Sequence, residues 1–281
     1  MRAGDDVLKK FFKLRGRRKL EVGEKTLVMG VLNFTPDSFS DGGKYFNRDA
    51  AMAHAAQIIE YGADIIDVGA ESTRPGATPI SADEEFDRLK KILPAIKKFG
   101  VPFSVDTYKP EVAEQVLKRG ASIINDVHGL EDLRMIDVAK KFNAPVIAMH
   151  NEKCSDGDIV DDVKKFFLRT LENCAAREFD TNKIIFDPGI GFGKTTDEDL
   201  TILRRLDELK NLGGKKIFLM VGVSRKSVIG HVTGLKLDQR DEATGALCVH
   251  AINKGVDMVR VHNVKLVSRM CLMTDRLLRG V

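Results

Sequence analysis

The stretch LVMGVLNFTPDSFSDGG, residues 27–43, joins a short apolar run to a long polar loop. An apolar run of this length without polar alternation is typical of a strand that is buried on both faces, as in parallel sheets. Seven more runs of this kind, rich in valine and isoleucine, follow at residues 63–68, 101–105, 121–124, 145–149, 183–186, 216–221 and 256–261. The sequence therefore predicts eight buried strands.

Amphipathic stretches with helical spacing separate these runs. Ser81 and Glu84 stand at the spacing of a capping box, which predicts the start of one helix. Pro94 is expected to kink that helix. Pro110 predicts the start of another helix and Gly120 its end. Strands that alternate with helices indicate an α/β fold with a parallel sheet.

Two architectures fit this alternation, a closed barrel and an open doubly wound sheet. Eight strands favour closure. Polar and glycine-rich clusters also follow several different runs, whereas an open sheet would gather them at one switch point. We therefore expect a single-domain (β/α)8 TIM barrel over residues 27–281, preceded by a basic N-terminal extension at residues 1–26.

Composition narrows the function classes. The 281 residues carry a formal net charge of +4, too small to indicate nucleic-acid binding, and there is no tryptophan for base stacking. The basic extension is expected to be a solvated arm or a first helix, without the apolar core of a signal peptide. No apolar run is long enough to span a membrane. The four cysteines are scattered, which indicates a reducing, cytoplasmic environment.

Polar side chains follow the apolar runs at many points along the chain. Each could be a helix cap or part of a surface ion pair. Arg74, taken alone, would be interpreted as part of a surface ion pair. Their common place at the carboxyl ends of predicted barrel strands indicates one rim where carboxylates, amides and cations meet. These segments are Asp67–Ala77, Asp106-Thr107, Asn125-Asp126, Asp187–Lys194, Gly222–Ser227 and Arg260–Asn263.

Two of the loops have further features. The 33–43 loop is longer than most strand–helix connections, and its two phenylalanines indicate a lid that packs on a ligand. The segment GIGFGK at 189–194 is rich in glycine but matches neither the P-loop nor the dinucleotide-binding spacing. We interpret it as a strand–helix loop that carries Phe192.

At these residues the sequence resembles the dihydropteroate synthase family, the folate-pathway enzymes that sulfonamides inhibit. Four motifs carry the resemblance, which extends from about residue 27 to the end: NFTPDSFSDGG at 33–43, ESTRPGA at 71–77, DPGIGFGK at 187–194 and SRKS at 224–227. It implies a (β/α)8 barrel, a homodimer and a transferase. It also implies the reaction, in which 6-hydroxymethyl-7,8-dihydropterin diphosphate and p-aminobenzoate give 7,8-dihydropteroate and diphosphate by dissociative substitution.

The resemblance also implies roles for individual positions. The pterin would contact Asp106, Asn125, Met149, Asp187, Gly222 and Lys226. The diphosphate would contact Asn33, Arg74, Arg260 and His262, with Asn33 also helping to hold Mg²⁺. The p-aminobenzoate pocket would comprise Phe39, Thr73, Pro75, Phe192 and Ser227. The flexible catalytic loop would include Thr35, Asp37, Ser38 and Asp41.

The sequence departs from the family pattern at a few positions. Residues 151–154 replace a usual glycine-containing turn, His128 stands where serine is common, and Asn263 stands where aspartate is common. Two alternative functions share the pterin residues: a barrel that handles methyltetrahydrofolate for methyl transfer, and a non-catalytic pterin-binding paralogue. Neither requires the long 33–43 loop, which favours the synthase.

Overall fold

Eight parallel strands close into a barrel in the computed structural model, which describes residues 10–14, 19–35, 48–72, 77–153, 155 and 157–280. The order around the barrel is β11-β12-β3-β4-β5-β6-β7-β8, and each strand pairs with its neighbours in parallel. The strands are β3 (Leu27–Asn33), β4 (Ile65–Gly69), β5 (Phe103–Asp106), β6 (Ile123–Asp126), β7 (Val146–Met149), β8 (Ile184–Asp187), β11 (Phe218–Val221) and β12 (Met258–Val261). The predicted TIM barrel is confirmed.

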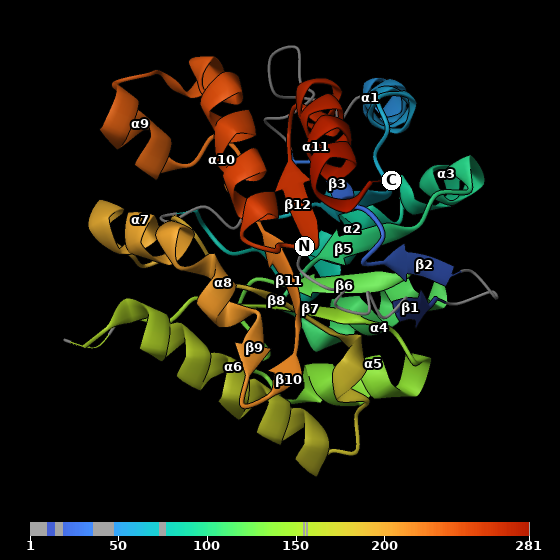
Figure 1. Cartoon of the computed structure of the whole chain (residues 1–281). Helices are drawn as coiled ribbons and strands as arrows, with labels where there is room; N and C mark the ends of the chain where they lie inside the picture. The colour runs from blue at the N-terminus through green and yellow to red at the C-terminus, as the bar shows by residue number, and fades with distance from the viewer. Residues whose placement is uncertain are drawn as a thin grey trace.

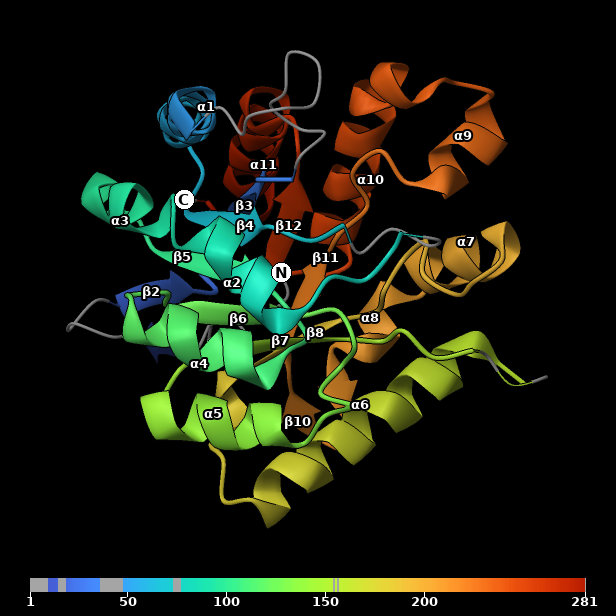
Figure 2. The same ribbon diagram turned by 180° about the vertical axis from the view of Figure 1, so that it is seen from behind.

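Helices surround the barrel and lie outside the strands in both views (Figures 1 and 2). They are α1 (Arg48–Glu60), α2 (Ala82–Leu89), α3 (Leu93–Ile96), α4 (Pro110–Lys118), α5 (Arg134–Phe142), α6 (Ile159–Ala176), α7 (Thr196–Arg204), α8 (Leu206–Leu209), α9 (Ser227–Thr233), α10 (Asp241–Asn253) and α11 (Val264–Arg279). Short 3₁₀ helices are η2 (Lys97–Phe99), η3 (Thr181–Lys183) and η4 (Leu237–Gln239). Among the described residues, no helix is both long and apolar enough to cross a bilayer.

Alternate residues of each strand point to opposite faces, and this divides the core into two clusters. Outward-facing residues such as Val68, Val105 and Phe186 pack under the helices. Inward-facing residues from the first halves of the strands fill the N-terminal end of the barrel; they include Met29, Ile65, Ile123, Ile147, Ile185, Met220 and Met258. The barrel is therefore packed at this end.

The N-terminal extension forms a hairpin against that apolar end, so the expected solvated arm or helix is wrong for its described residues. Strand β1 (Lys10–Lys13) pairs antiparallel with β2 (Lys19–Val22). Phe12, Leu14, Leu20 and Val22 are buried and join the inward-facing apolar cluster. The physical reason is the spacing: apolar residues at 12 and 14, and at 20 and 22, recur with the period of a strand that has one buried face. The basic composition obscured this alternation.

Three local expectations need smaller corrections. Ser81 caps α2 by accepting the Glu84 backbone N–H at 3.1 Å, but the Glu84 carboxylate binds Arg88 and does not complete a capping box. Pro94 does not kink a continuous helix; α2 ends at Leu89, and Pro94 lies in the first turn of α3. The expected strand at 216–221 divides into β10 (Lys215–Lys216), which pairs with β9 (Asn211–Leu212), and β11.

Candidate active site

The inward-facing positions change from apolar to polar toward the carboxyl ends of the strands. On β4, Asp67 comes two residues after the buried Ile65, and on β8, Asp187 comes two residues after Ile185. Asn125 on β6 and Arg260 on β12 follow in the same way, at two residues after Ile123 and Met258. Because a shift of two residues keeps a side chain on the same face, these polar groups lie above the apolar layer inside the barrel.

Arg260 joins two of the carboxylates. Its Nε donates to Asp67 Oδ2 at 2.6 Å and its terminal nitrogen donates to Asp106 Oδ2 at 2.9 Å. Asp67 also accepts Ser104 Oγ at 2.5 Å and Asn125 Nδ2 at 3.2 Å. These bonds connect β4, β5, β6 and β12, so the barrel brings together residues up to 193 positions apart. Such charge-assisted bonds hold each planar group in a defined orientation.

Asp106 is poised between two protonation states. Burial raises its pKa to about 7, although Arg260 opposes that shift, and the neighbouring Asp67 carboxylate adds to it. Its Oδ1 atom is buried and has no hydrogen-bond partner among the residues that the structure describes. A buried polar atom without a partner is costly in a folded protein and is one mark of a ligand site. Asp106 can therefore bind a ligand as a carboxylate or as a carboxylic acid.

Asp187 lies beside Gly222, which leaves space around it, and beside the buried Met149. Its Oδ1 accepts the Gly189 backbone N–H at 2.8 Å, and burial raises its pKa. A Cβ atom at Gly222 would lie 3.5 Å from Asp187 Oδ2, so a larger side chain there would crowd this oxygen. Met149 pairs with Asp187 across β7 and β8 and is buried. The arrangement provides an acceptor beside an apolar surface.

Lys226 and Phe192 meet at the side of the mouth formed by β8 and β11. The Lys226 Nζ atom lies 3.8 Å from the centroid of the Phe192 ring. Burial lowers the pKa of Lys226 to about 8, and Asp187 opposes that shift. Ser227 is exposed and is the first residue of α9. These three predicted residues therefore share one side of the site.

His262 directly follows β12, and Ser224 holds it in place. Ser224 Oγ accepts the His262 backbone N–H at 3.1 Å and lies 2.9 Å from His262 Nδ1. If the hydroxyl donates to Nδ1, the neutral imidazole carries its proton on Nε2 and can donate it to an anion. Asn263 caps α11 by accepting the Leu266 N–H and donates to Asp241 at 2.9 Å. The unusual asparagine thus serves as a helix cap.

The remaining predicted residues divide into two groups. Asn33 ends β3, and its Oδ1 would lie 3.4 Å from a Cβ at Gly69, which places the amide over the adjacent strand end. Thr35 is half-buried just beyond it. The other predicted positions lie outside the described residues: Asp37, Ser38, Phe39, Asp41, Thr73, Arg74 and Pro75.

Sequence reasoning missed two supports of the site, Asp67 and Ser104, and an ionic cluster beside it. Asp67 begins one of the polar segments that follow the apolar runs, and its register two residues after Ile65 was the signal that it faces inward. Lys109 bridges Glu71 and Glu85, the second at 2.7 Å, and both carboxylates are buried. Glu71 also accepts the Ile80 N–H at 3.1 Å, so it connects the two described ends of the 71–80 loop.

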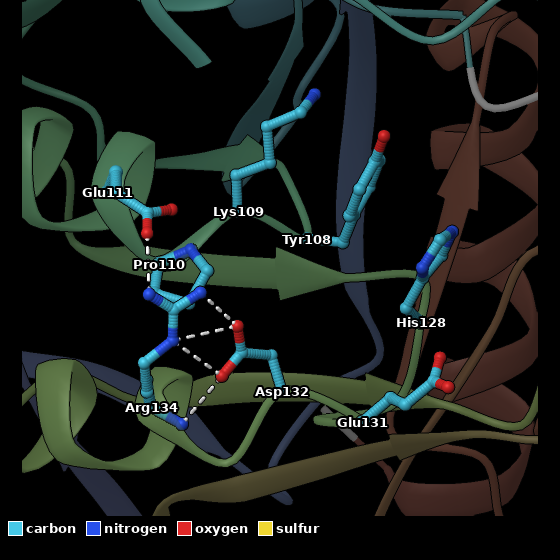
Figure 3. Close-up of a pocket in the computed structure, with 8 residues that line it drawn as sticks. All are labelled: Tyr108, Lys109, Pro110, Glu111, His128, Glu131, Asp132 and Arg134. Carbon is cyan, nitrogen blue, oxygen red and sulfur yellow. Dashed lines mark hydrogen bonds and ion pairs between the residues drawn. The ribbon is translucent and has the colours of Figure 1, made fainter. Parts of the chain in front are cut away.

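A separate cavity of about 420 Å³ lies at the start of α4 and α5, beside the loops that follow β5 and β6 (Figure 3). Tyr108 and His128 stack face to face along it, with ring centroids 4.0 Å apart. Arg134 forms ion pairs there with Glu111 and Asp132. No predicted site residue lines this cavity, so the convergence inside the barrel mouth is the stronger candidate for the active site.

The described residues contain no group of three or more histidine, cysteine, aspartate or glutamate side chains that could hold a metal ion. A magnesium ion would not need such a group, because it retains several waters and commonly binds through one or two protein oxygens together with substrate phosphates. The Asn33 amide oxygen at the rim fits this limited role. The donor set is therefore compatible with a metal that arrives with a phosphorylated substrate.

Comparisons with known proteins agree on one family. A model described as "Pterin binding enzyme" matches residues 29–262. The dihydropteroate synthase of Bacillus subtilis is 45% identical over 262 residues, which cover 92% of this chain and 91% of that protein. A Clostridium difficile dihydropteroate synthase structure determined in the presence of pteroic acid has a TM-score of 0.88 and 44% identity, covering 92% of this chain and 99% of the other. A Xanthomonas albilineans dihydropteroate synthase structure with 4-aminobenzoic acid has a TM-score of 0.89 and 34% identity, covering 96% and 98%.

Proposed function

Because the chain belongs to the dihydropteroate synthase family of pterin binding enzymes, we propose that it joins p-aminobenzoate to 6-hydroxymethyl-7,8-dihydropterin diphosphate by dissociative substitution. As a member of this family it is a transferase of folate biosynthesis. The observation that carries the proposal is the convergence of Asp106, Asn125 and Asp187 beside Arg260 at one barrel mouth, with His262 two residues further along the chain. A flat heterocycle would lie among the first three residues and a polyanion beside the last two.

The pterin fits the polar layer chemically. Its amino-pyrimidine edge presents parallel N–H groups, and a buried carboxylate such as Asp187 can accept two of them. Asn125 can both donate and accept, and Lys226 can donate to a ring acceptor. Met149 would lie against a face of the ring, and Gly222 would leave it space beside Asp187.

The diphosphate would lie at the rim, where cations are available. Arg260 already has two carboxylate partners, so its guanidinium is held in place before the substrate arrives. His262 would donate from Nε2, and Arg74 would be a further cation. Mg²⁺ bound by the phosphates and Asn33 would neutralise charge on the leaving group. Donors that are oriented in advance stabilise developing charge without further reorganisation.

The p-aminobenzoate would bind at the Phe192 and Lys226 side of the mouth. Phe192 offers an aromatic face, and Ser227 offers a hydroxyl for the carboxylate. We assign Phe39, Thr73 and Pro75 to the same pocket from the family resemblance. The Xanthomonas albilineans dihydropteroate synthase was determined with 4-aminobenzoic acid, which supports this substrate for a protein of the same family.

In the proposed reaction the bond between the exocyclic CH₂ and the diphosphate oxygen breaks first, and the diphosphate leaves with the electron pair. The resulting pterin cation is stabilised by the Asp106 and Asp187 carboxylates. The neutral aryl amine then forms the C–N bond and loses a proton to solvent or to diphosphate. An aryl amine is uncharged near neutral pH, which explains why the mechanism requires no strong general base.

The test is diphosphate release by the purified protein with the pterin diphosphate and Mg²⁺, with and without p-aminobenzoate. We expect release coupled to formation of 7,8-dihydropteroate, and a slow release without the amine if substitution is dissociative. Methyl transfer from methyltetrahydrofolate to a corrinoid would indicate the methyltransferase alternative. Pterin binding without turnover would indicate a non-catalytic paralogue.

We also propose that the protein is a homodimer and acts in the cytoplasm. Four large apolar side chains on α11 are 51–73% exposed, namely Leu272, Met273, Leu277 and Leu278, and a second copy of the chain would cover them. Light scattering of the wild type and of Leu277→Glu tests the dimer, and we expect the variant to be monomeric. The buried cysteines Cys174, Cys248 and Cys271 are free thiols, which supports a reducing compartment.

A further inference from the structure

Lys194, the last residue of the GIGFGK segment, directs its ammonium group into a cage of backbone carbonyls. Its Nζ donates to Gly189 O at 3.0 Å, to Phe192 O at 3.0 Å and to His150 O at 3.2 Å. An ammonium has three donors, so these bonds match its full capacity. Two of the carbonyls belong to its own loop and the third to the loop after β7. The side chain therefore ties two strand ends together.

The loop conformation depends on this arrangement. Gly189 and Gly191 adopt φ values of +70° and +76°, a region that glycine occupies without strain. A Cβ atom at Gly189 would lie 1.9 Å from the His150 carbonyl oxygen, so the two loops are in close contact. Asp199, which lies on α7, accepts the Gly191 backbone N–H at its Oδ1 atom, at a distance of 2.8 Å. Lys194 and Asp199 thus both hold the loop, Lys194 through backbone carbonyls and Asp199 through a backbone N–H.

The fixed loop forms a wall against Lys226. A Cβ atom at Gly191 would lie 3.1 Å from Lys226 Cδ, so the aliphatic stem of Lys226 passes close to this glycine. The Phe192 ring then lies 3.8 Å from Lys226 Nζ. Carbonyls that point inward to Lys194 leave the Phe192 ring directed toward Lys226. A shift of the loop would therefore change both the aromatic wall and the hydration of this ammonium.

We propose that Lys194 is a positioning residue: its ammonium acts as an internal cation that organises the 189–193 loop and so holds Phe192 against Lys226, where the aryl amine substrate binds. The assignment of the substrate rests on the proposed function above. The positioning of Phe192 and Lys226 is independent of it and has a readout that requires no turnover.

The first experiment measures the exposure of the Lys226 amine. Acylation of Lys226 by a small reagent, followed by mass spectrometry across a pH series, reports its titration. The charged groups that act on Lys226 are Asp187 on β8, Arg260 on β12, Asp199 on α7 and Asp106 on β5. In Lys194→Met these groups stay, while the loop that covers the amine loosens. We expect the pKa of Lys226 to rise toward its ordinary value in the variant, and we expect faster acylation only at high pH, where the amine is neutral in both proteins.

The second experiment uses kinetics. Lys194→Met should raise KM for p-aminobenzoate about tenfold, as expected when charge-assisted bonds that hold a substrate wall are lost. Binding of the pterin diphosphate alone should change less, by about threefold, because Asp106 and Asn125 lie on other strands and only Asp187 and Lys226 of the pterin residues border the loop. Lys140→Met is the matched control, since Lys140 also donates to a backbone carbonyl but is exposed on α5. It should leave both properties unchanged.

Chemical rescue separates a cation in a cage from general loss of stability. In Lys194→Ala, added n-propylammonium should restore part of the affinity for the aryl amine, whereas tetramethylammonium, which has no N–H donor, should not. If Lys194→Met does not fold, Lys194→Gln replaces it, because its amide keeps N–H donors but carries no charge, and it should change Lys226 and KM in the same direction by a smaller amount. Normal Lys226 acylation and normal KM in a folded, merely less stable variant would overturn the proposal. Absence of wild-type turnover would overturn the proposed function alone.

Discussion

The two ends of the barrel are built from the same eight strands but perform opposite tasks. At the N-terminal end the inward positions are apolar, and the β1–β2 hairpin covers them with Phe12, Leu14, Leu20 and Val22. At the C-terminal end the inward positions two residues later carry buried charges joined by Arg260. Apolar burial stabilises the first end, whereas buried charge generally costs free energy unless it is paired or used. The comparison teaches that stability and ligand recognition are separated by only two residues along β4, β6, β8 and β12.

The largest effect is expected at the polar end of β8, from Asp187→Asn. An amide offers one carbonyl acceptor and turns its NH₂ group toward the pterin donors, so kcat/KM should fall about 1000-fold, as when a site loses a matched hydrogen bond. The free energy of unfolding should stay within about 1 kcal/mol, because the amide oxygen can still accept the Gly189 N–H. Steady-state kinetics and urea unfolding test the two claims. Activity within about tenfold of the wild type would contradict the assignment.

The apolar end of the same strand should respond in the opposite way. Ile185 is fully buried two residues before Asp187, and Ile185→Ala should reduce the free energy of unfolding by about 3 kcal/mol through lost burial and a residual cavity. Pterin affinity of the folded fraction should be unchanged, which calorimetry can measure. A large loss of affinity with little loss of stability would mean that the two ends are not separate.

The sequence predicted the barrel because all eight runs are apolar on the outward face. This pattern is the same whether the residues on the inward face are apolar or polar. Asp106, Asn125, Asp187 and Arg260 were predicted because polar residues follow the apolar runs there and because the family resemblance assigns roles to these positions. The sequence did not predict Asp67 as a partner of Arg260, since pairing across 193 positions depends on barrel closure and register. The hairpin was missed because its alternation is short and its composition is basic. In both cases a short local pattern was present, but only the closed barrel shows what those side chains contact.

A pH-dependent effect of intermediate size is expected at Asp106. Its pKa in the folded protein, about 7, is raised above the ordinary value, so the fold favours the protonated form. The associated stability is present below the unfolded-state pKa, near about 4, and is lost as pH rises through 7. Asp106→Asn mimics the protonated acid, so the variant should be about 1 to 2 kcal/mol more stable than the wild type at pH 8 and equal to it near pH 4.

Asp132→Asn is the control for the direction of this pH dependence of stability. The pKa of the half-exposed Asp132 is lowered by its bonds to Arg134, so its contribution to stability is present above its unfolded-state pKa and disappears as pH falls. Urea unfolding should show that the stability difference between Asp106→Asn and the wild type grows from pH 5 to pH 8, whereas the deficit of Asp132→Asn stays constant over that range and shrinks only below about pH 4. The same trend in both would mean that burial does not control Asp106.

The smallest effect tests whether the hairpin belongs to the apolar end. The Phe12 and Phe218 rings meet edge to face, with centroids 5.2 Å apart and planes at 83°. Phe12→Leu keeps an apolar side chain but removes this ring pair, so the free energy of unfolding should fall by about 1 kcal/mol. Phe99→Leu is the control, because Phe99 is 38% exposed and should tolerate the change. An equal response in both variants would mean that the Phe12–Phe218 ring pair adds nothing beyond the apolar burial that leucine also provides.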